Sequence, residues 1–498
     1  LRELGFVLYA TAGTRQHLAV SSIQATPIEE LTGAPEVLEG RVKTLHPAIH
    51  AAIQAKRGNP SHERDLAKLG AEPIDLVVVN LRSFQSVVQQ ANASEEEALD
   101  NVDIGGAALL RAAARNYEGV LVVVDPEDYV PILRALRSGN VDRATRRALA
   151  AKAFQLTAAY DSAIAGFLRD PNRPLPDQLT LSLQKVADLR YGENPHQRGA
   201  IYIQSPNPRP RRTLAGALRL TNKRMSFANT LDLDAALTCV REFAAPAVAI
   251  FKHGNPCGIA VGPNLADAYQ RAQAGDPVSA VGAGIAINRQ VDLETAQLIA
   301  ATFYEDIVAP GYDPDALDIL RGNHELRIFE VDMGPLDEAA LRISPALALD
   351  LKRVGGGFLV QTPDVLADDE TSFRAASNRE PTLEELTNLI FAWKAVKHAK
   401  SNAVVLAKRL ALVGVGAGQT SRGDATDLAI RKAESRAVGS VLASDAYFTR
   451  PEPLLEAARA GVTAVVQPAG GARLDEIARM ADEHHMALVL TDYRHYSH

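Results

Sequence analysis

Short, continuous runs of apolar residues alternate along the chain with longer segments of helical composition. Residues 6–9 predict a short buried strand, and Thr11, Gly13 and Thr14 fall in the tight turn expected behind it. Two further runs, at 75–80 and 120–125, are apolar up to a final Asn80 or Asp125. Such runs are typical of parallel strands that are covered by helices on both faces. The pattern therefore predicts an α/β protein whose ligands gather at the carboxyl ends of these strands.

Helical composition at 106–116 and 126–168 leads into a proline-rich polar stretch at 169–177, which predicts a linker. Beyond it the alternation resumes, with strands expected at 247–251, 283–288, 307–310, 403–406, 462–467 and 487–491. A second polar stretch, at 362–381, divides this region. We therefore expect three parts, at 1–180, 181–370 and 371–498.

The composition is that of a soluble globular protein, with 498 residues of which 47% are hydrophobic and 23% charged. A net charge of -7 argues against nucleic acid or an anionic membrane as the main partner, so any phosphate must meet a local cationic pocket. Two cysteines, Cys239 and Cys257, exclude a disulfide framework and a multi-cysteine metal site. We find no signal-peptide pattern and no apolar run near the roughly 18 residues of a membrane span. We expect a cytoplasmic protein that lacks some N-terminal sequence here, since the chain opens without methionine.

Candidate chemistry in the later part of the chain centres on Lys252 and His253, at the end of an apolar strand and before a turn shaped by glycine and proline. A histidine takes a proton near neutral pH, and a lysine binds an anion, although a surface lysine beside a half-buried histidine is the alternative. Asn402 lies where a lysine-rich helical segment enters another strand. The glycine-rich residues 413–422 end at Arg422 and suit a close approach to a phosphate, or only a hairpin.

Two more segments combine cations with groups that recognise nucleotides. Arg190 and Tyr191 suit a phosphate beside a planar ring, or a capped loop. Residues 40–47 carry Arg41 and Lys43 in a turn, and Asp103 precedes a helix, where it serves an anion site or simply caps the helix. We find no Walker-type loop, no serine elbow and no zinc-deaminase signature.

Taken together, in order and spacing, these segments resemble the family of bifunctional purine biosynthesis proteins (PurH) that join AICAR transformylase to IMP cyclohydrolase. AICAR is an aminoimidazole carboxamide ribonucleotide. The matching segments cover essentially the whole chain and include 40–47, 103–106, 190–197, 252–258, 276–280, 309–312, 397–403, 416–422, 444–446 and 494–498. The resemblance implies an α/β fold with a methylglyoxal-synthase-like parallel-sheet domain at the N-terminus. It also implies a C-terminal transformylase of two cytidine-deaminase-like subdomains without zinc, and a homodimer with transformylase sites between subunits.

By this resemblance, formyl passes from 10-formyltetrahydrofolate to AICAR, and the product FAICAR closes to IMP without a catalytic metal. His253 takes the proton of the attacking amine, Lys252 assists electrostatically, and Asn402 orients the amine. The residues implied to hold the ribonucleotide or complete its pocket are Arg190, Tyr191, Arg422, Arg494, Gly282, Glu305 and Phe448.

For the cyclohydrolase, the resemblance implies catalysis by Lys43 and Asp103, with Arg82 and Arg115 at two further catalytic positions. The substrate-binding positions implied are Thr11, Gly13, Thr14, Arg41, Thr44, Asn80, Gly105 and Gly106. The chain departs from the family pattern, because Arg82 stands where a tyrosine is usual and Arg115 where a lysine is usual. These two departures leave open a monofunctional transformylase with an inactive nucleotide-binding N-terminal domain. Intact Lys252, His253 and Asn402 argue against a silent ligand-binding protein, and a nucleoside deaminase would require zinc.

Overall fold

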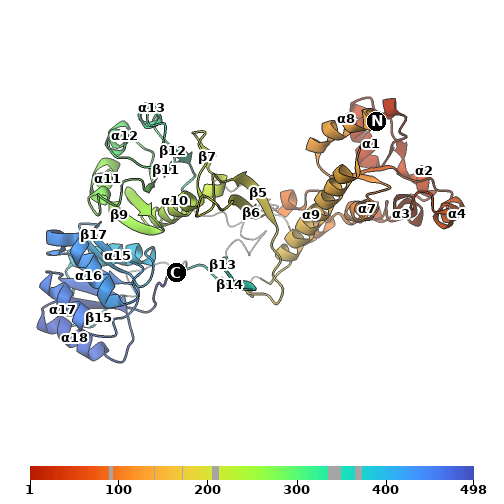
Figure 1. Ribbon diagram of the computed structural model, residues 1–498. Coiled ribbons are helices and arrows are strands. Elements are labelled where there is room, and N and C mark those ends of the chain that lie inside the picture. The colour runs from red at the N-terminus through yellow and green to blue at the C-terminus, as the bar shows by residue number, and fades with distance from the viewer. Residues whose placement is uncertain (89–93, 140, 171, 205–211, 335–348, 365–372) are drawn as a thin grey trace. The chain divides into compact units, whose positions relative to one another are not determined.

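The computed structural model describes residues 1–88, 94–139, 141–170, 172–204, 212–334, 349–364 and 373–498. The chain forms two compact units (Figure 1). Unit 1 holds Leu1–Gln184, Gln204–Asn207 and Glu338–Thr362, and unit 2 holds Lys185–Ile203, Pro208–Asp337 and Pro363–His498. The boundary expected at residue 370 lies outside the described residues.

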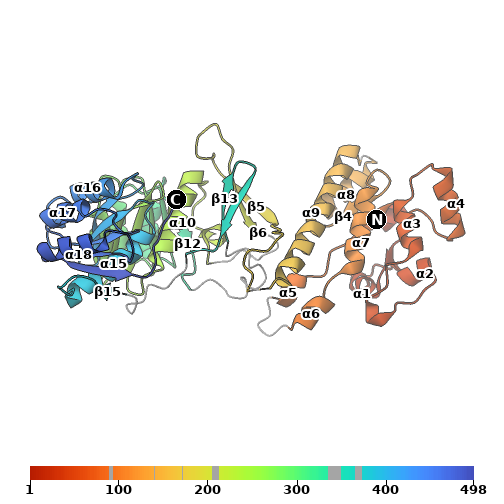
Figure 2. The same ribbon diagram turned by 90° about the horizontal axis from the view of Figure 1, so that it is seen from below.

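Unit 1 is built on two pairs of short parallel strands, β1 with β2 and β3 with β4, and on helices around them. The long helix α9 packs on α7 and on β4, as both views show (Figures 1 and 2). The elements are β1 (Tyr9–Ala10), α1 (Ala12–Val20), β2 (Thr26–Pro27), α2 (Ile28–Thr32), α3 (Pro47–Gln54), α4 (Pro60–Lys68), β3 (Leu76–Val78), α5 (Phe84–Val88), α6 (Glu95–Asp100), α7 (Ile104–Arg115), β4 (Leu121–Val123), α8 (Tyr129–Arg137), α9 (Arg143–Phe167) and the hairpin β13 (Asp350–Val354) with β14 (Gly357–Gln361).

The prediction for residues 6–14 is wrong in two respects. Only Tyr9 and Ala10 form a strand, and the Val7 side chain is 70% exposed instead of buried. The tight turn expected behind the strand is the start of α1, with Thr11 at the N-cap and Gly13 and Thr14 in the first turn. A run of threonine, alanine and glycine is compatible with a helix start as well as with a turn, so local sequence did not decide between them.

Unit 2 contains a 12-stranded sheet made of two halves with the same order of elements. The first half comprises β7 (Leu218–Arg219), α10 (Phe227–Val240), β8 (Ala247–Lys252), β9 (Asn255–Val261), α11 (Leu265–Gln273), β10 (Gly284–Ile287), α12 (Leu293–Ala300), β11 (Asp306–Ala309), α13 (Pro314–Arg321) and β12 (Arg327–Glu330). The second half comprises β15 (Arg374–Ala375), α15 (Leu383–Lys397), β16 (Val404–Lys408), β17 (Ala411–Gly416), α16 (Arg422–Ala433), β18 (Val441–Ser444), α17 (Glu452–Arg459), β19 (Ala464–Pro468), α18 (Leu474–Glu483) and β20 (Ala487–Thr491). A two-stranded sheet, β5 (Leu183–Asp188) with β6 (Ala200–Gln204), precedes β7 in the chain.

In each half a hairpin leads through an antiparallel neighbour into three parallel strands. The order is β9-β8-β10-β11-β12 in the first half and β17-β16-β18-β19-β20 in the second. The halves join where β17 pairs with β9 in antiparallel sense. Because the junction is antiparallel, the start of β10 and the end of β18 lie at the same edge of the sheet. This edge carries the candidate transformylase residues.

Matched glycines show how closely helix and sheet approach in both halves. A Cβ atom on Gly258 would lie 1.7 Å from the Ala272 carbonyl oxygen, and one on Gly414 would lie 2.1 Å from that of Ala429. The glycine-rich run that suggested contact with a phosphate is therefore partly the strand β17, and Gly414 serves the packing of α16. That interpretation of the run is wrong for Gly414, because only tertiary packing shows what fills the space beside a glycine.

Candidate functional site

The hairpin turn between β8 and β9 presents Lys252 and His253. His253 has φ 54° and Gly254 has φ 71°, which are the two positive values of a type I′ turn. A left-handed residue other than glycine costs roughly 1–2 kcal/mol, so the turn needs support at His253. Asp232 of α10 provides it, because its carboxylate accepts the N–H of His253 at 3.0 Å and that of Gly254 at 2.6 Å. The expected turn is formed by His253 and Gly254 alone, and Pro256 already belongs to β9, which begins at Asn255.

The Lys252 side chain reaches the segment that precedes β10. Its Nζ donates to the Val281 carbonyl at 2.7 Å. The next residue, Gly282, has φ 74°, and a Cβ there would be 3.8 Å from that Nζ. Lys252 and Gly282, predicted from distant parts of the sequence, are thus neighbours.

Asn255 joins this turn to the segment that holds Asn402. Its Nδ2 donates to the His253 carbonyl at 3.2 Å, and its Oδ1 accepts the Lys400 N–H at 3.0 Å. Asn402 in turn donates from Nδ2 to the Gln419 carbonyl at 2.9 Å. The structure therefore brings the three predicted catalytic residues to one edge of the sheet, from both halves of unit 2.

The last residues of the chain lie against this segment. The Ser401 N–H donates to the Ser497 carbonyl at 2.8 Å, and the Lys400 Nζ donates to the His498 carbonyl at 3.0 Å. Within the same tail, the Arg494 guanidinium stacks over the Tyr496 ring at 4.3 Å. Arg494 is therefore held beside the Asn402 segment by the tail to which it belongs.

Arg422 and Phe448 are more deeply engaged in the protein than the sequence suggested. Arg422 donates to Asp445 Oδ1 at 2.7 Å and to Ser444 Oγ at 2.8 Å, and its side chain is 11% exposed. Phe448 is 1% exposed within the apolar core of the second half. The structure places its ring in the core and not in a pocket wall, so the prediction for that side chain is corrected.

Glu305 lies just before β11 and is held from two sides. Asn229 of α10 donates to it at 2.6 Å, and Arg327 of β12 donates to it at 3.0 Å. Arg327 also pairs with the enclosed Asp306 at 2.6 Å. Burial raises the pKa of Asp306 to about 6, against the opposing effect of Arg327. This network orients the Glu305 carboxylate, which stays 40% exposed.

Arg190 and Tyr191 lie in a loop next to the start of α10. The Arg190 N–H donates to the Met225 carbonyl at 2.9 Å, and its guanidinium lies 5.6 Å from the Tyr191 ring centroid. Arg190 is exposed and Tyr191 half-buried. The pair therefore presents a cation next to an aromatic face, as the sequence predicted for a nucleotide.

In unit 1 the candidate cyclohydrolase residues meet at the start of α7. Asp103 caps the helix by accepting the Gly106 N–H at 2.7 Å, and its other oxygen accepts the Arg82 backbone N–H at 3.3 Å. A Cβ on Gly105 would lie 2.4 Å from Thr44 Oγ1, so the loop that carries Lys43 packs directly on α7. Asp103 thus caps α7, and its carboxylate keeps lone pairs that can also accept a proton or a hydrogen bond from a ligand.

Other residues predicted for this site lie elsewhere or have partners of their own. Arg115 ends α7, twelve residues from Asp103, which is about 18 Å along a helix, and it donates to Gln54 at 3.0 Å. Within one chain these two residues therefore do not meet. Arg41 pairs with Asp100 on the surface. Asn80 donates to the Val124 carbonyl at 3.0 Å and accepts from Tyr129 at 2.7 Å.

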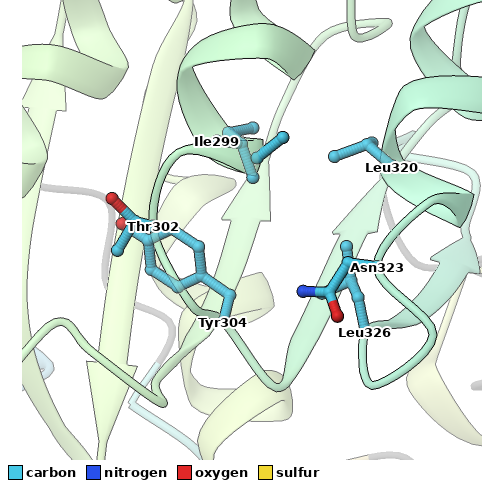
Figure 3. A pocket seen from close by; sticks show the side chains of 7 residues that line it. Ile299, Thr302, Tyr304, Leu320, Asn323 and Leu326 are labelled. Atoms are coloured by element: carbon cyan, nitrogen blue, oxygen red, sulfur yellow. The ribbon is translucent and has the colours of Figure 1, made fainter.

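Two hollows among the described residues of unit 2 lie away from Lys252, His253 and Asn402. One is a mostly apolar cavity of about 10 Å³ beside Tyr304 and Leu320, which is too small for a nucleotide (Figure 3). The other is a surface hollow of about 390 Å³ beside Lys223 and His324. Over the described part of the chain, no group of three histidine, cysteine or acidic residues is placed to bind a metal. No helix among these residues is long and apolar enough to cross a membrane.

Sequence reasoning missed Asp232 and Asn255, which hold the hairpin turn and connect it to the second half. Asp232 is 7% exposed and shares a helix face with Leu233, Ala236 and Leu237. A carboxylate within such a face is a signal that it has a buried partner. Its partner is the backbone of the turn, which no pattern of residue types specifies.

The chain is thus an α/β protein of two units: a larger one with two similar halves, of which the first carries the Lys252-His253 turn, and a smaller one with pairs of parallel strands. Two family models match it: "AICARFT/IMPCHase bienzyme" over residues 113–432 and "MGS-like domain" over residues 1–108. The chain belongs to the family of bifunctional purine biosynthesis proteins, PurH. It acts in de novo purine biosynthesis as an AICAR formyltransferase with a folate co-substrate, and as an IMP cyclohydrolase.

Relatives of that name align over the whole chain. The protein of Oceanobacillus iheyensis is 42% identical over 499 residues, covering 100% of this chain and 96% of its own. That of Acidithiobacillus ferrooxidans is 44% identical over 508 residues, covering 100% and 95%. A solved structure described as "Crystal structure of ForH" is 35% identical and covers 33% of this chain and 85% of its own, with a TM-score of 0.28, too low to bear on the fold. The predicted fold class and bifunctional activity are confirmed, and the monofunctional alternative is not favoured.

Proposed function

We propose that formyl transfer takes place at the edge of the unit 2 sheet where Lys252, His253 and Asn402 lie, with 10-formyltetrahydrofolate as donor. The observation that supports this most directly is the pair of hydrogen bonds made by Asn255, at 3.2 Å to His253 and 3.0 Å to Lys400. A side chain that ties the base to the neighbouring segment keeps the distance between catalytic groups constant, and positioning dominates catalysis with a weak nucleophile.

In the proposed reaction, the 5-amino nitrogen of AICAR attacks the formyl carbon, and His253 takes the proton that the amine loses. The lone pair of this amine is delocalised into the imidazole ring, so its attack depends on orientation by Asn402. Lys252 supplies positive charge near the developing oxyanion. When the tetrahedral intermediate collapses, the bond from carbon to the folate nitrogen breaks, and that nitrogen accepts the proton from His253.

Ring closure of FAICAR is assigned to the start of α7 in unit 1. The carboxamide nitrogen attacks the formyl carbon of the same molecule, and water leaves. Asp103 and Lys43 are the proposed proton-transfer groups, and Arg82 adds positive charge at the position of the usual tyrosine. Because the reaction is intramolecular, holding FAICAR in its folded conformer accounts for much of the rate. Thr44, Gly105 and Gly106 form the floor of this proposed site.

We further propose that the protein acts as a cytoplasmic homodimer. Three apolar side chains near Lys252 are solvent-exposed in the single chain: Val278 at 84%, Val281 at 47% and Phe303 at 45%. A cluster of this kind is typical of a surface covered by another subunit or a ligand. Cys239 and Cys257 are unpaired thiols, which suits a reducing compartment.

The test supplies AICAR and 10-formyltetrahydrofolate to the purified chain and follows tetrahydrofolate and IMP. The His253→Ala variant is expected to lose formyl transfer by about 100-fold or more while it still converts added FAICAR to IMP. If His253→Ala kept full formyl transfer, His253 would not be the base. The site would then have to be assigned elsewhere, although the protein would still be a formyltransferase.

A further inference from the structure

The hairpin turn of the candidate transformylase site has a structural duplicate in the second half. Lys408, Arg409 and Leu410 join β16 to β17 as Lys252, His253 and Gly254 join β8 to β9. Arg409 and Leu410 have φ 52° and 57°, so both turns are type I′. Lys408 Nζ donates to the Val438 carbonyl at 2.6 Å, just as Lys252 donates to that of Val281. The two turns therefore share backbone conformation and lysine placement.

Each turn is anchored by a buried side chain from the preceding helix. In the first half Asp232 of α10 accepts two N–H groups of the turn, and in the second half Asn388 of α15 accepts the Leu410 N–H at 2.8 Å. The two anchors are 7% and 6% exposed. They differ in charge and in the number of turn N–H groups that they accept: two for the carboxylate of Asp232 and one for the neutral amide of Asn388.

The second half shows what the turn requires by itself. With one hydrogen bond, donated by the Leu410 N–H to the neutral amide of Asn388, the turn keeps positive φ values at both positions without a glycine. Burying a carboxylate costs free energy unless it is hydrogen-bonded and paired with a positive charge. The negative charge of Asp232 thus exceeds what the turn conformation needs, and it lies next to the backbone of the residue that we assign as the base.

The charged groups around Asp232 come from several elements. Lys252 lies on β8, and Lys400 approaches from the second half, with its Cε 3.6 Å from the position of a Cβ on Gly254. Asp306 on β11 is already paired with Arg327, which also holds Glu305. The Arg327 cation is therefore shared between Glu305 and Asp306, and Lys252 and Lys400 are the lysines that lie close to the turn held by Asp232.

We propose that Asp232 is a positioning residue for formyl transfer whose negative charge, and not only its hydrogen-bonding geometry, is needed for the reaction. Taking the amine proton gives His253 a positive charge beside Lys252, and a fixed carboxylate under the turn offsets the repulsion between them. Asp232 exchanges no proton in this step. The proposal rests on the assignment of Lys252 and His253 as the catalytic pair.

The experiment replaces Asp232 by asparagine, which reproduces the neutral anchor of the second half. We expect Asp232→Asn to lower kcat for formyl transfer by about 10- to 100-fold, with KM for AICAR and for the folate changed less than about threefold. The reciprocal variant Asn388→Asp, which adds a charge to the other turn, is the matched control and is expected to keep kcat within about twofold. The melting temperature and conversion of FAICAR to IMP are measured on the same samples.

A folded Asp232→Asn protein with unchanged kcat would overturn the proposal, and so would an equal loss of kcat in Asn388→Asp. If Asp232→Asn does not fold, Asp232→Ser offers a smaller neutral acceptor with the same expected loss. Failure of both neutral variants to fold would make the carboxylate a requirement of the fold and would also overturn its specific role. His253→Ala, assayed in parallel, separates these results from failure of the catalytic assignment, since full activity there would refute the assignment whatever Asp232 does.

Discussion

Arg422 donates to Asp445 at 2.7 Å, and the carboxylate it contacts is fully enclosed. The same guanidinium reaches Ser444 at 2.8 Å and the Tyr447 carbonyl at 3.4 Å. Asp445 also accepts from Ser401 at 2.5 Å, next to Asn402. This pair therefore connects the start of α16 with the segment that carries Asn402, and it does so from inside the protein.

Replacing Arg422 by alanine is expected to lower the free energy of unfolding by about 3 kcal/mol, because Asp445 is left buried without its cation. Urea denaturation measures this loss. A variant with wild-type stability and a raised KM for AICAR would instead support the phosphate-binding role that the resemblance implied. The exposed pair Arg459 and Glu456 offers a control, since Arg459→Ala should change stability by less than about 1 kcal/mol.

Asn255→Ala should separate the hairpin turn from the Asn402 segment. Without these two hydrogen bonds, the distance between His253 and Asn402 is no longer fixed by Asn255. Misplacement of a catalytic group by about 1 Å lowers the rate on the order of 100-fold. We expect kcat for formyl transfer to fall by about 10- to 100-fold, with cyclisation in unit 1 unchanged. An unaltered kcat would show that other contacts already hold the two segments in register.

Lys43→Ala should abolish the conversion of FAICAR to IMP, a loss of about 100-fold or more, and spare formyl transfer. Lys68→Ala is the matched control, because Lys68 makes only a surface pair with Asp65 in the same unit. Spectrophotometric assay of IMP formation from FAICAR distinguishes the two variants. Rapid cyclisation by Lys43→Ala would show that another residue near the start of α7 transfers the proton.

Glu242 makes stability depend on pH. Burial raises its pKa, but the hydrogen bond to His398 and the charge of Lys397 outweigh this and lower it to about 2, from 4.5 in the unfolded chain. A lowered pKa stabilises the fold above pH 4.5, and the contribution is lost as pH falls from 4.5 towards 2. Glu242→Gln should therefore cost about 2–3 kcal/mol at pH 7 and flatten the acid limb of the stability curve. An acid limb identical to that of the wild type would contradict this.

Gly258→Ala and Gly414→Ala should both destabilise unit 2, since the added methyl group would meet a helix carbonyl at 1.7 Å or 2.1 Å. Overpacking of this kind costs about 1–3 kcal/mol or more, and refolding yield and melting temperature report it. Gly418→Ala is a different case, because Gly418 has φ 66° but nothing within 4 Å of its Cβ position. It should cost only about 1 kcal/mol of backbone strain.

Apolar runs in the sequence predicted six of the twelve strands of the unit 2 sheet: β8, β10, β11, β16, β19 and β20. They missed β17, where Gly414 and Gly416 resemble a loop in isolation. A strand that packs this closely under a helix needs glycine, so residue types that indicate a loop locally are those that the tertiary contact requires. The error at residues 6–14 has a similar origin, because a helix start and a tight turn use the same small polar residues.

The sequence predicted the segments of the site one by one, and only the resemblance to the family indicated that they lie close together in space. Lys252 and His253 carry a visible chemical pattern, and so do Arg190 and Tyr191. Asp232 has no such pattern, because it binds backbone N–H groups that any sequence would offer. Phe448 was placed in the pocket by resemblance alone, and only the structure shows that its side chain is buried in the core.

The sequence by itself determined the alternation of strands and helices, the chemical types at the Lys252-His253 turn and at Asp103, and membership of the PurH family. Only the tertiary structure decided that the two halves of unit 2 meet through an antiparallel β9-β17 pair. That pairing places the end of β8 in one half and the start of β16 in the other at the same edge of the sheet, so Lys252, His253 and Asn402 share this edge. The physical reason is that strand direction across a junction depends on long-range hydrogen bonds and packing, which local residue patterns do not encode.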